Sequence, residues 1–228
     1  MRAALPAALL AAAFAAHPFP LAAETLSVDA AHSHAEFGVH VLWFGKIAGR
    51  LDGLQGTLDL DRRQGMATVD VHVAAAAVRM DDRRYADWAR GPDFFDAAQH
   101  PQIRFVSQPF PLDRLQQGGA LAGTLTLRGI SRPVRFELLP QPCRLAALDP
   151  AQAATVSASA AGINASASAA TAPTTTLAVA ASTTAPAVLC RALARGSIER
   201  AHFGMTAQRF TIGDRVELGL VLSIPPTP

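Results

Sequence analysis

The side chains best suited to chemistry in this sequence are histidines near one glutamate. His32, His34, Glu36 and His40 fall in the stretch AHSHAEFGVHV, where alternate residues of a strand share one face. Two histidines two residues apart on a strand can bind one metal ion, and a carboxylate can complete the site. His40 lies about 20 Å from His34 at the rise of a strand. We favour a solvated outer face without metal. The alternative is a metal-binding or stress-related accessory protein that uses His32, His34 and Glu36.

Sequence motifs of common enzyme classes are absent. The chain has no GxSxG, P-loop, GxGxxG, HExxH or CxxC pattern, so it is not expected to be an enzyme or to need a cofactor. Its formal net charge is +2, and the arginines are scattered among acids without a basic block. Nucleic acid is therefore not an expected partner.

Phenylalanines provide a second candidate site. Phe94 and Phe95 stand between acids in DFFDAAQHPQIRFVS, just before an alternating strand pattern. Such residues either pack in an ordinary core or line a cavity, because a closed barrel of about eight strands can fill its interior or hold a small ligand. The sequence alone leaves both open.

Most of the chain has the two-residue period of strands that are buried on one face. The most regular run has apolar residues at Val216, Leu218, Leu220, Leu222 and Ile224. Turn residues separate about eight such runs, which predicts an all-β fold with an antiparallel eight-stranded barrel or a sandwich.

One segment departs from this period. MDDRRYADWARG, residues 80–91, begins with two acids, has Tyr85 and Trp88 three residues apart and ends at Gly91. It predicts one short helix.

The N-terminal residues 1–23 have the charge, apolar run and small residues of a signal peptide. The mature chain, 24–228, is then one exported domain without a stable membrane anchor, periplasmic or secreted. Residues from about 150 to 189 form an uncharged Ala/Ser/Thr insert of low complexity. Cys143 and Cys190 flank it, and in an oxidising compartment they predict a disulfide.

Five stretches together resemble the YceI-like family of periplasmic polyisoprenoid-binding proteins. They are LSVDAAHSHAEFGV, IAGRLDGLQGTLDLD, DFFDAAQHPQIRFVS, GALAGTLTLRGISRPVRFEL and GSIERAHFGM. The resemblance covers residues 25–225 apart from the insert.

The resemblance implies a lipocalin-like barrel that encloses an apolar tunnel for an isoprenoid lipid, such as a quinone tail or a polyprenyl chain. Arg50, Asp93 and Arg200 are candidates for polar groups near its opening. Of Phe94 and Phe95, one is expected to face the ligand and the other the core. A homodimer is left open. The expected tunnel-lining residues are Phe37, Val39, Val41, Phe94, Phe95, Phe105, Leu125, Phe136, Phe203 and Leu220.

Overall fold

The computed structural model describes residues 24–42, 45–143 and 190–225. The expected signal peptide, 1–23, and the low-complexity insert, about 150–189, lie outside the described residues. No helix within the described ranges is long and apolar enough to cross a membrane.

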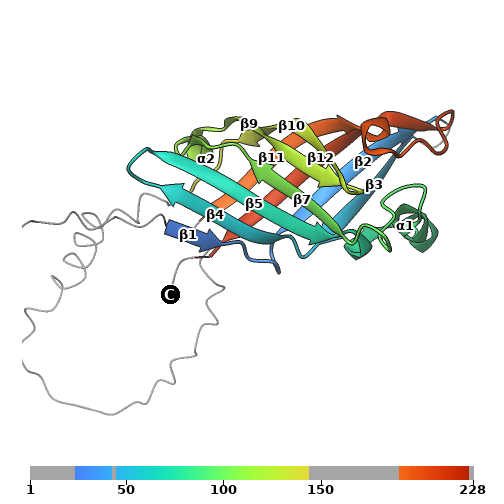
Figure 1. Ribbon diagram of the computed structural model, residues 1–228, viewed down its shortest axis with the longest axis horizontal. Helices are drawn as coiled ribbons and strands as arrows, with labels where there is room; N and C mark the ends of the chain where they lie inside the picture. The colour runs from blue at the N-terminus through green and yellow to red at the C-terminus, as the bar shows by residue number, and fades with distance from the viewer. Residues whose placement is uncertain (1–23, 43–44, 144–189, 226–228) are drawn as a thin grey trace, which may run out of the picture.

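The described chain is built mainly from strands (Figure 1). Across these residues the strands are β1 (Glu24–Ser27), β2 (His34–Val41), β3 (Gly45–Asp52), β4 (Gln55–Asp61), β5 (Met66–Ala74), β6 (Val78–Met80), β7 (Gln102–Ser107), β8 (Phe110–Pro111), β9 (Gly119–Leu127), β10 (Ile130–Leu139), β11 (Cys190–Glu199) and β12 (Ile212–Ile224). The helical segments are η1 (Ala75–Ala77), α1 (Arg83–Arg90), α2 (Arg114–Gln117) and η3 (Arg200–Phe203).

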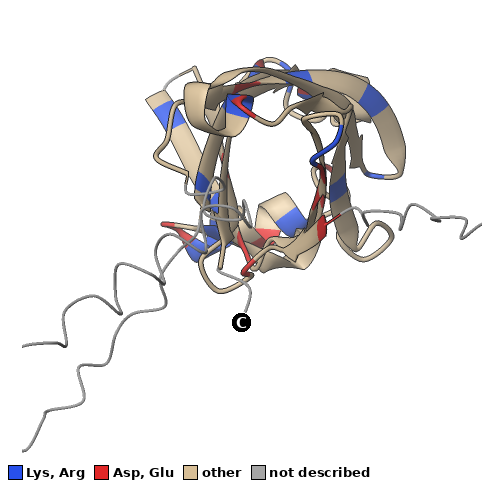
Figure 2. Ribbon diagram, turned by 90° about the vertical axis from the view of Figure 1, so that its left-hand side faces the viewer, with Lys and Arg blue, Asp and Glu red and all other residues tan. Residues whose placement is uncertain are grey.

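One antiparallel sheet contains all of these strands. Its order is β1-β4-β5-β7-β9-β10-β11-β12-β2-β3-β6, and β8 pairs with β5. The sheet curls into a ring around a central space (Figure 2). The all-β, barrel-like class is confirmed. The expected count of eight strands is too low, since the described sheet has twelve. Three of these, β1, β6 and β8, have only two to four residues each, too few to show a two-residue period.

Three connections close the ring where the edges of the sheet meet. The chain passes from β5 through η1 to β6, which pairs with β3 at Gly49, Arg50 and Leu51. A second connection, the turn after Asp52, joins β3 to β4. The third leads from β1 to β2, where the amide of Asp29 donates to the carbonyl of Ser223, 2.8 Å away on β12.

Glycines on the inner face make room for aromatic rings. A Cβ atom built on Gly49 would lie 2.3 Å from the ring of Phe37, and one on Gly123 would lie 2.5 Å from the ring of Phe105. At Gly196 the nearest atom of the Phe136 ring would be at 2.8 Å. A ring laid over a strand glycine restores the contacts that the missing side chain would have made. The rings therefore lie flat along the inner wall.

Helix α1 lies at one end of the barrel (Figure 1), and the sequence predicted that this segment is a helix. Asp82 caps it by accepting a hydrogen bond from the amide of Arg84, and Gly91 ends it. The guanidinium of Arg90 donates to the carbonyl oxygens of Ala76 and Val78, at 3.0 and 2.6 Å. These bonds hold the helix against η1 and β6.

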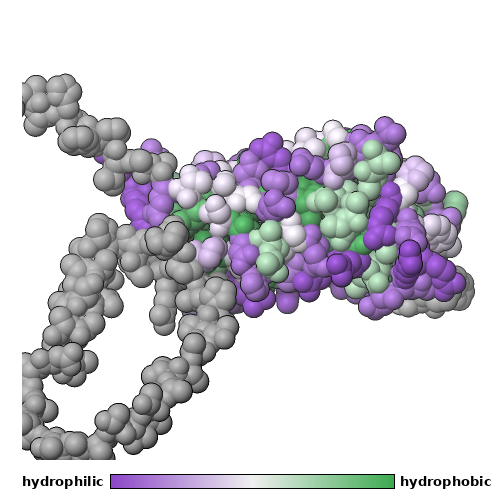
Figure 3. Space-filling view, turned by 90° about the horizontal axis from the view of Figure 1, so that it is seen from below, coloured by the Kyte–Doolittle hydropathy of each residue, from purple (hydrophilic) through white to green (hydrophobic). Residues whose placement is uncertain are grey.

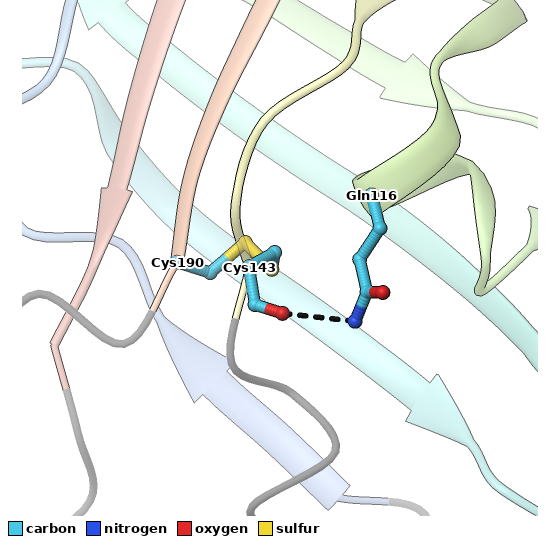
Figure 4. The surroundings of a disulfide bond; sticks show 3 residues. All are labelled: Gln116, Cys143 and Cys190. Atoms are coloured by element: carbon cyan, nitrogen blue, oxygen red, sulfur yellow. Dashed lines mark hydrogen bonds between the residues drawn. A yellow bond between two sulfur atoms is a disulfide. The ribbon is translucent and has the colours of Figure 1, made fainter.

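The other end of the barrel carries the predicted disulfide between Cys143 and Cys190, 47 positions apart (Figure 4). Both cysteines are buried. The side-chain amide of Gln116, on α2, donates to the carbonyl oxygen of Cys143 at 2.8 Å. The disulfide and α2 thus stabilise the same end of the sheet.

We predict that Cys143→Ser/Cys190→Ser lowers the free energy of unfolding by about 4 kcal/mol, since the crosslink restricts a loop of this size in the unfolded chain. Urea unfolding followed by far-UV circular dichroism measures the difference. The unmodified protein in reductant is the matched control and should unfold like the variant. Equal midpoints for the oxidised protein and the double variant would contradict the prediction.

Candidate ligand-binding cavity

The interior of the barrel differs between its two ends. At the disulfide end only about 20 Å³ is empty, among residues such as Leu58, Val71 and Leu222. Towards α1 there is a central cavity of about 120 Å³, and beyond it a mouth cavity of about 290 Å³ under the helix. One half of the barrel is therefore a packed core and the other half is hollow.

The central cavity is almost wholly apolar. Its wall contains side chains from β2, β9, β10, β11 and β12, from α1 and from the loop that follows α1. The apolar lining residues are Ala35, Phe37, Val39, Leu51, Leu54, Val73, Ala89, Phe94, Phe95, Ile103, Leu125, Leu127, Phe136, Ile198, Met205, Ile212, Val216, Leu218 and Leu220.

The mouth cavity shares part of this lining and is more polar. Phe37, Val39, Ala89, Phe94 and Ile212 line both cavities, so the two are neighbours. The lining residues found only at the mouth are Val41, Ile47, Met80, Tyr85, Trp88, Gln208 and Thr211. An apolar chain in the central cavity would therefore meet polar groups as it leaves.

An aromatic pair marks the boundary between the hollow half and the packed half. The rings of Phe105 and Phe136 meet edge to face with centroids 5.1 Å apart. Phe136 lines the central cavity, Phe105 belongs to the packed end, and Leu220 borders both. This arrangement limits how far a ligand can enter.

Eight of the ten expected lining residues lie on the two cavities. Phe105 and Phe203 do not: Phe105 belongs to the packed end, and Phe203, the last residue of η3, is 1% exposed in the core. The other eight are Phe37, Val39, Val41, Phe94, Phe95, Leu125, Phe136 and Leu220.

The adjacent phenylalanines after α1 both face the central cavity. Phe95 packs edge to face on Phe37 with centroids 5.4 Å apart, while Phe94 also reaches the mouth. The guanidinium of Arg128 donates to the carbonyl oxygens of Pro92 and Phe94, both at 2.6 Å. The expectation that one ring faces the cavity and the other only the core is therefore too simple.

Of the three expected polar groups, only Arg200 lines the central cavity or the mouth cavity. Arg50 alternates on β3 with the inward Gly49 and Leu51, so it points outward and pairs with Asp52. Asp93 is exposed on the loop after α1. Arg200, in contrast, is 3 % exposed and belongs to the wall of the central cavity.

The guanidinium of Arg200 holds the loop between η3 and β12. It donates to the carbonyl oxygens of Met205 and Ala207 at 2.7 and 2.8 Å, and to those of Ile212 and Gly213 at 3.0 Å each. Four of its five N–H donors are used in this way. The buried cation thus fixes the loop that forms one side of the mouth.

The charge of Arg200 is compensated by the dipoles of these carbonyl groups and not by a direct ion pair. Burial lowers the pKa of its guanidinium, which the carboxylate of Asp214 opposes, and an arginine remains protonated at neutral pH. Asp214 itself accepts a hydrogen bond from the amide of Ala201 at 2.9 Å.

Several lining residues were not indicated by the sequence. Ala89 comes from the inner face of α1, and Met205, Gln208, Thr211 and Ile212 come from the loop held by Arg200. The loop has no periodic pattern, so its position depends on the buried arginine. Ala89 could have been predicted from its spacing of four residues from Tyr85, because residues four apart share a helix face.

The candidate metal ligands are divided between two pairs. His32 lies in the turn before β2, where its Nδ1 is 2.6 Å from a carboxylate oxygen of Asp29. His34 begins β2, and its Nε2 is 3.3 Å from a carboxylate oxygen of Glu36. Within the described residues no three histidine, cysteine, aspartate or glutamate side chains gather as a metal site.

Comparison with known proteins places the chain in a family. The YceI-like domain model matches residues 26–224. The protein belongs to the YceI-like family. No match was found among curated proteins.

Solved structures of this type have similar folds at low sequence identity. BcnA of Burkholderia cenocepacia aligns with a TM-score of 0.57 at 16% identity, over 86% of this chain and 98% of that one. A polyisoprenoid-binding domain of Saccharophagus degradans aligns at 0.54 and 12% identity, over 88% and 98%. The YceI protein of Campylobacter jejuni aligns at 0.55 and 15% identity, over 82% and 89%.

We predict that Arg200→Met destabilises the protein by more than about 3 kcal/mol, because several buried carbonyl oxygens lose their donor. Arg200→Lys should recover part of this loss, since an ammonium group is charged but lacks the planar fork. Arg195→Met, an exposed change on β11, is the control and should stay within about 0.5 kcal/mol. Equal urea midpoints for the Arg200 and Arg195 variants would contradict the role assigned to Arg200.

Proposed function

We propose that the protein binds an isoprenoid lipid, a quinone tail or a polyprenyl chain, and holds it outside the cytoplasm as a periplasmic carrier or storage protein. The observation that carries the proposal is the hollow, apolar half of the barrel, which is open beside α1 and closed at the Phe105–Phe136 pair. Membership of the YceI-like family and the solved polyisoprenoid-binding domain with the same fold support it.

The apolar chain enters first and its head group stays at the mouth. At roughly 25 cal/mol per Å² of apolar surface, burying about 300 Å² of a prenyl chain contributes about 7 kcal/mol before ordering costs. Tyr85, Gln208 and Thr211 line the mouth and offer hydroxyl and amide groups to a quinone ring or an alcohol. A chain longer than the hollow half leaves its remaining length outside.

Binding of this kind requires no chemical step by the protein. The titratable side chains at the two cavities are Glu36, Tyr85 and Arg200. Arg200 is occupied by backbone carbonyls, and the side chain of Glu36 is 59% exposed beside His34. This supports a binding protein over an enzyme that acts on the lipid.

Native mass spectrometry of the mature protein from its own exported fraction tests the proposal. We expect a bound species of defined mass near one per chain, identified as an isoprenoid after organic extraction. A protein that is empty, and that takes up neither added ubiquinone nor added polyprenol, would contradict the proposal.

A cavity-filling variant locates the ligand. Ala89→Leu adds bulk where the central cavity meets the mouth, and we predict that it weakens uptake of added ubiquinone about tenfold or more. Ala48→Leu adds the same bulk on the outer face of β3, where Ala48 is exposed, and should leave uptake unchanged. Thermal unfolding confirms that both variants are folded. Equal uptake by the two variants would place the ligand outside this cavity.

A further inference from the structure

The three large apolar side chains that are most exposed among the described residues lie at one end of the molecule. Phe210 is 90% exposed, Leu42 71% and Trp88 59%. A large apolar side chain in water is unremarkable when it stands alone, but a group of them indicates a contact surface.

These residues, called the rim below, surround the opening of the mouth cavity. The amide of Leu42 donates to the carbonyl oxygen of Thr211 at 3.0 Å, and Phe210 immediately precedes Thr211 in the chain. Thr211 and Trp88 both line the mouth cavity. The rim is therefore continuous with the route by which an apolar ligand would enter.

The loop that carries Phe210 is held in place. The amides of Thr211 and Ile212 donate to the carbonyl oxygen of Gln208 at 3.0 and 2.9 Å. Arg200 binds the carbonyl oxygens of Ala207 and Ile212 on either side of this turn. Phe210 thus projects from an ordered turn and has no partner to cover it among the described residues.

One charge beside the rim suits an anionic surface. Arg209 is exposed next to Phe210, whereas Arg84, one turn before Trp88 on α1, is paired with Asp82 at 2.7 Å. The acid nearest Trp88, Asp87, is paired with Arg90 at 2.8 Å. Aromatic and leucine side chains with arginines beside them are typical of elements that insert into the interface of a bilayer.

We propose that the rim docks on the surface of a lipid bilayer. Leu42, Trp88 and Phe210 insert among the lipids, and Arg209 contacts anionic head groups. The mouth cavity then opens onto the membrane, so an apolar chain moves between bilayer and barrel without exposure to water. This inference rests on the proposed function for its purpose, while the docking is measurable separately.

Flotation of the mature protein with vesicles tests the docking. We expect binding to phosphatidylcholine vesicles that increases when phosphatidylglycerol is included and weakens with added salt. Leu42→Ser/Phe210→Ser should lower the partition coefficient about tenfold or more, and Arg209→Glu should remove the preference for anionic vesicles. Leu193→Ser, a half-buried position at the disulfide end, is the matched control and should bind like the unmodified protein.

Two results would overturn the docking proposal. One is equal partition of the unmodified protein and the Leu42→Ser/Phe210→Ser variant. The other is a dimer that the same substitutions dissociate, with no binding to either vesicle, which would make the rim a contact between two copies of the chain.

Measuring ligand uptake distinguishes membrane docking by the rim from isoprenoid binding, the proposed function on which it rests. Without vesicles, the rim variant should bind added ubiquinone as the unmodified protein does, whereas its extraction of ubiquinone from vesicles should be about tenfold slower. A protein that floats with vesicles through its rim but binds no isoprenoid from either source would support docking and contradict the proposed function. A rim variant that extracts ubiquinone at the unmodified rate would contradict docking.

Discussion

Closure of one curled sheet is the constraint on which the rest of the structure depends. Three connections cross the line where the sheet edges meet, and among them η1 brings β6 to β3 beneath α1. The path of paired strands ends at β1 and β6, so the chain connections, and not strand pairing, complete the ring. The ring encloses an interior that side chains must fill or leave empty. At the disulfide end they fill it as far as the rings of Phe105 and Phe136, which lie over Gly123 and Gly196, and beyond this pair they leave space. The hollow half follows from this packing.

The open end depends on a buried cation. Arg200 fixes the loop from Met205 to Gly213 through four carbonyl oxygens, and that loop provides one side of the mouth. Arg200 thus holds both the cavity wall and the loop beside the mouth.

In the space-filling view of Figure 3, hydrophobic residues lie in patches among hydrophilic ones along the body of the barrel. Hydrophilic residues are expected on a sheet whose outer face meets water.

Strand periodicity predicted much of this fold, and residue type predicted part of the site. The alternation around Phe37 and Leu220 indicated inward rows, and the acids before Tyr85 indicated α1. Alternation shows which residues face inward but not how far along the barrel they lie, so Phe105 was grouped with Phe136 although it belongs to the packed end. The loop after η3 follows no period, and the choice of Arg200 over Arg50 requires the three-dimensional path of the chain. Strands as short as β8 are likewise set by tertiary pairing and not by a local pattern.

A crystal structure of the protein in complex with an isoprenoid lipid would test the central claim most directly. The account predicts continuous electron density for an apolar chain that begins at the Phe105–Phe136 pair, passes Ala89 and ends in a polar group near Gln208 and Thr211. Density confined to the outer face of the sheet beside Arg50, or a hollow half closed by rearranged phenylalanine rings with the ligand elsewhere, would contradict it.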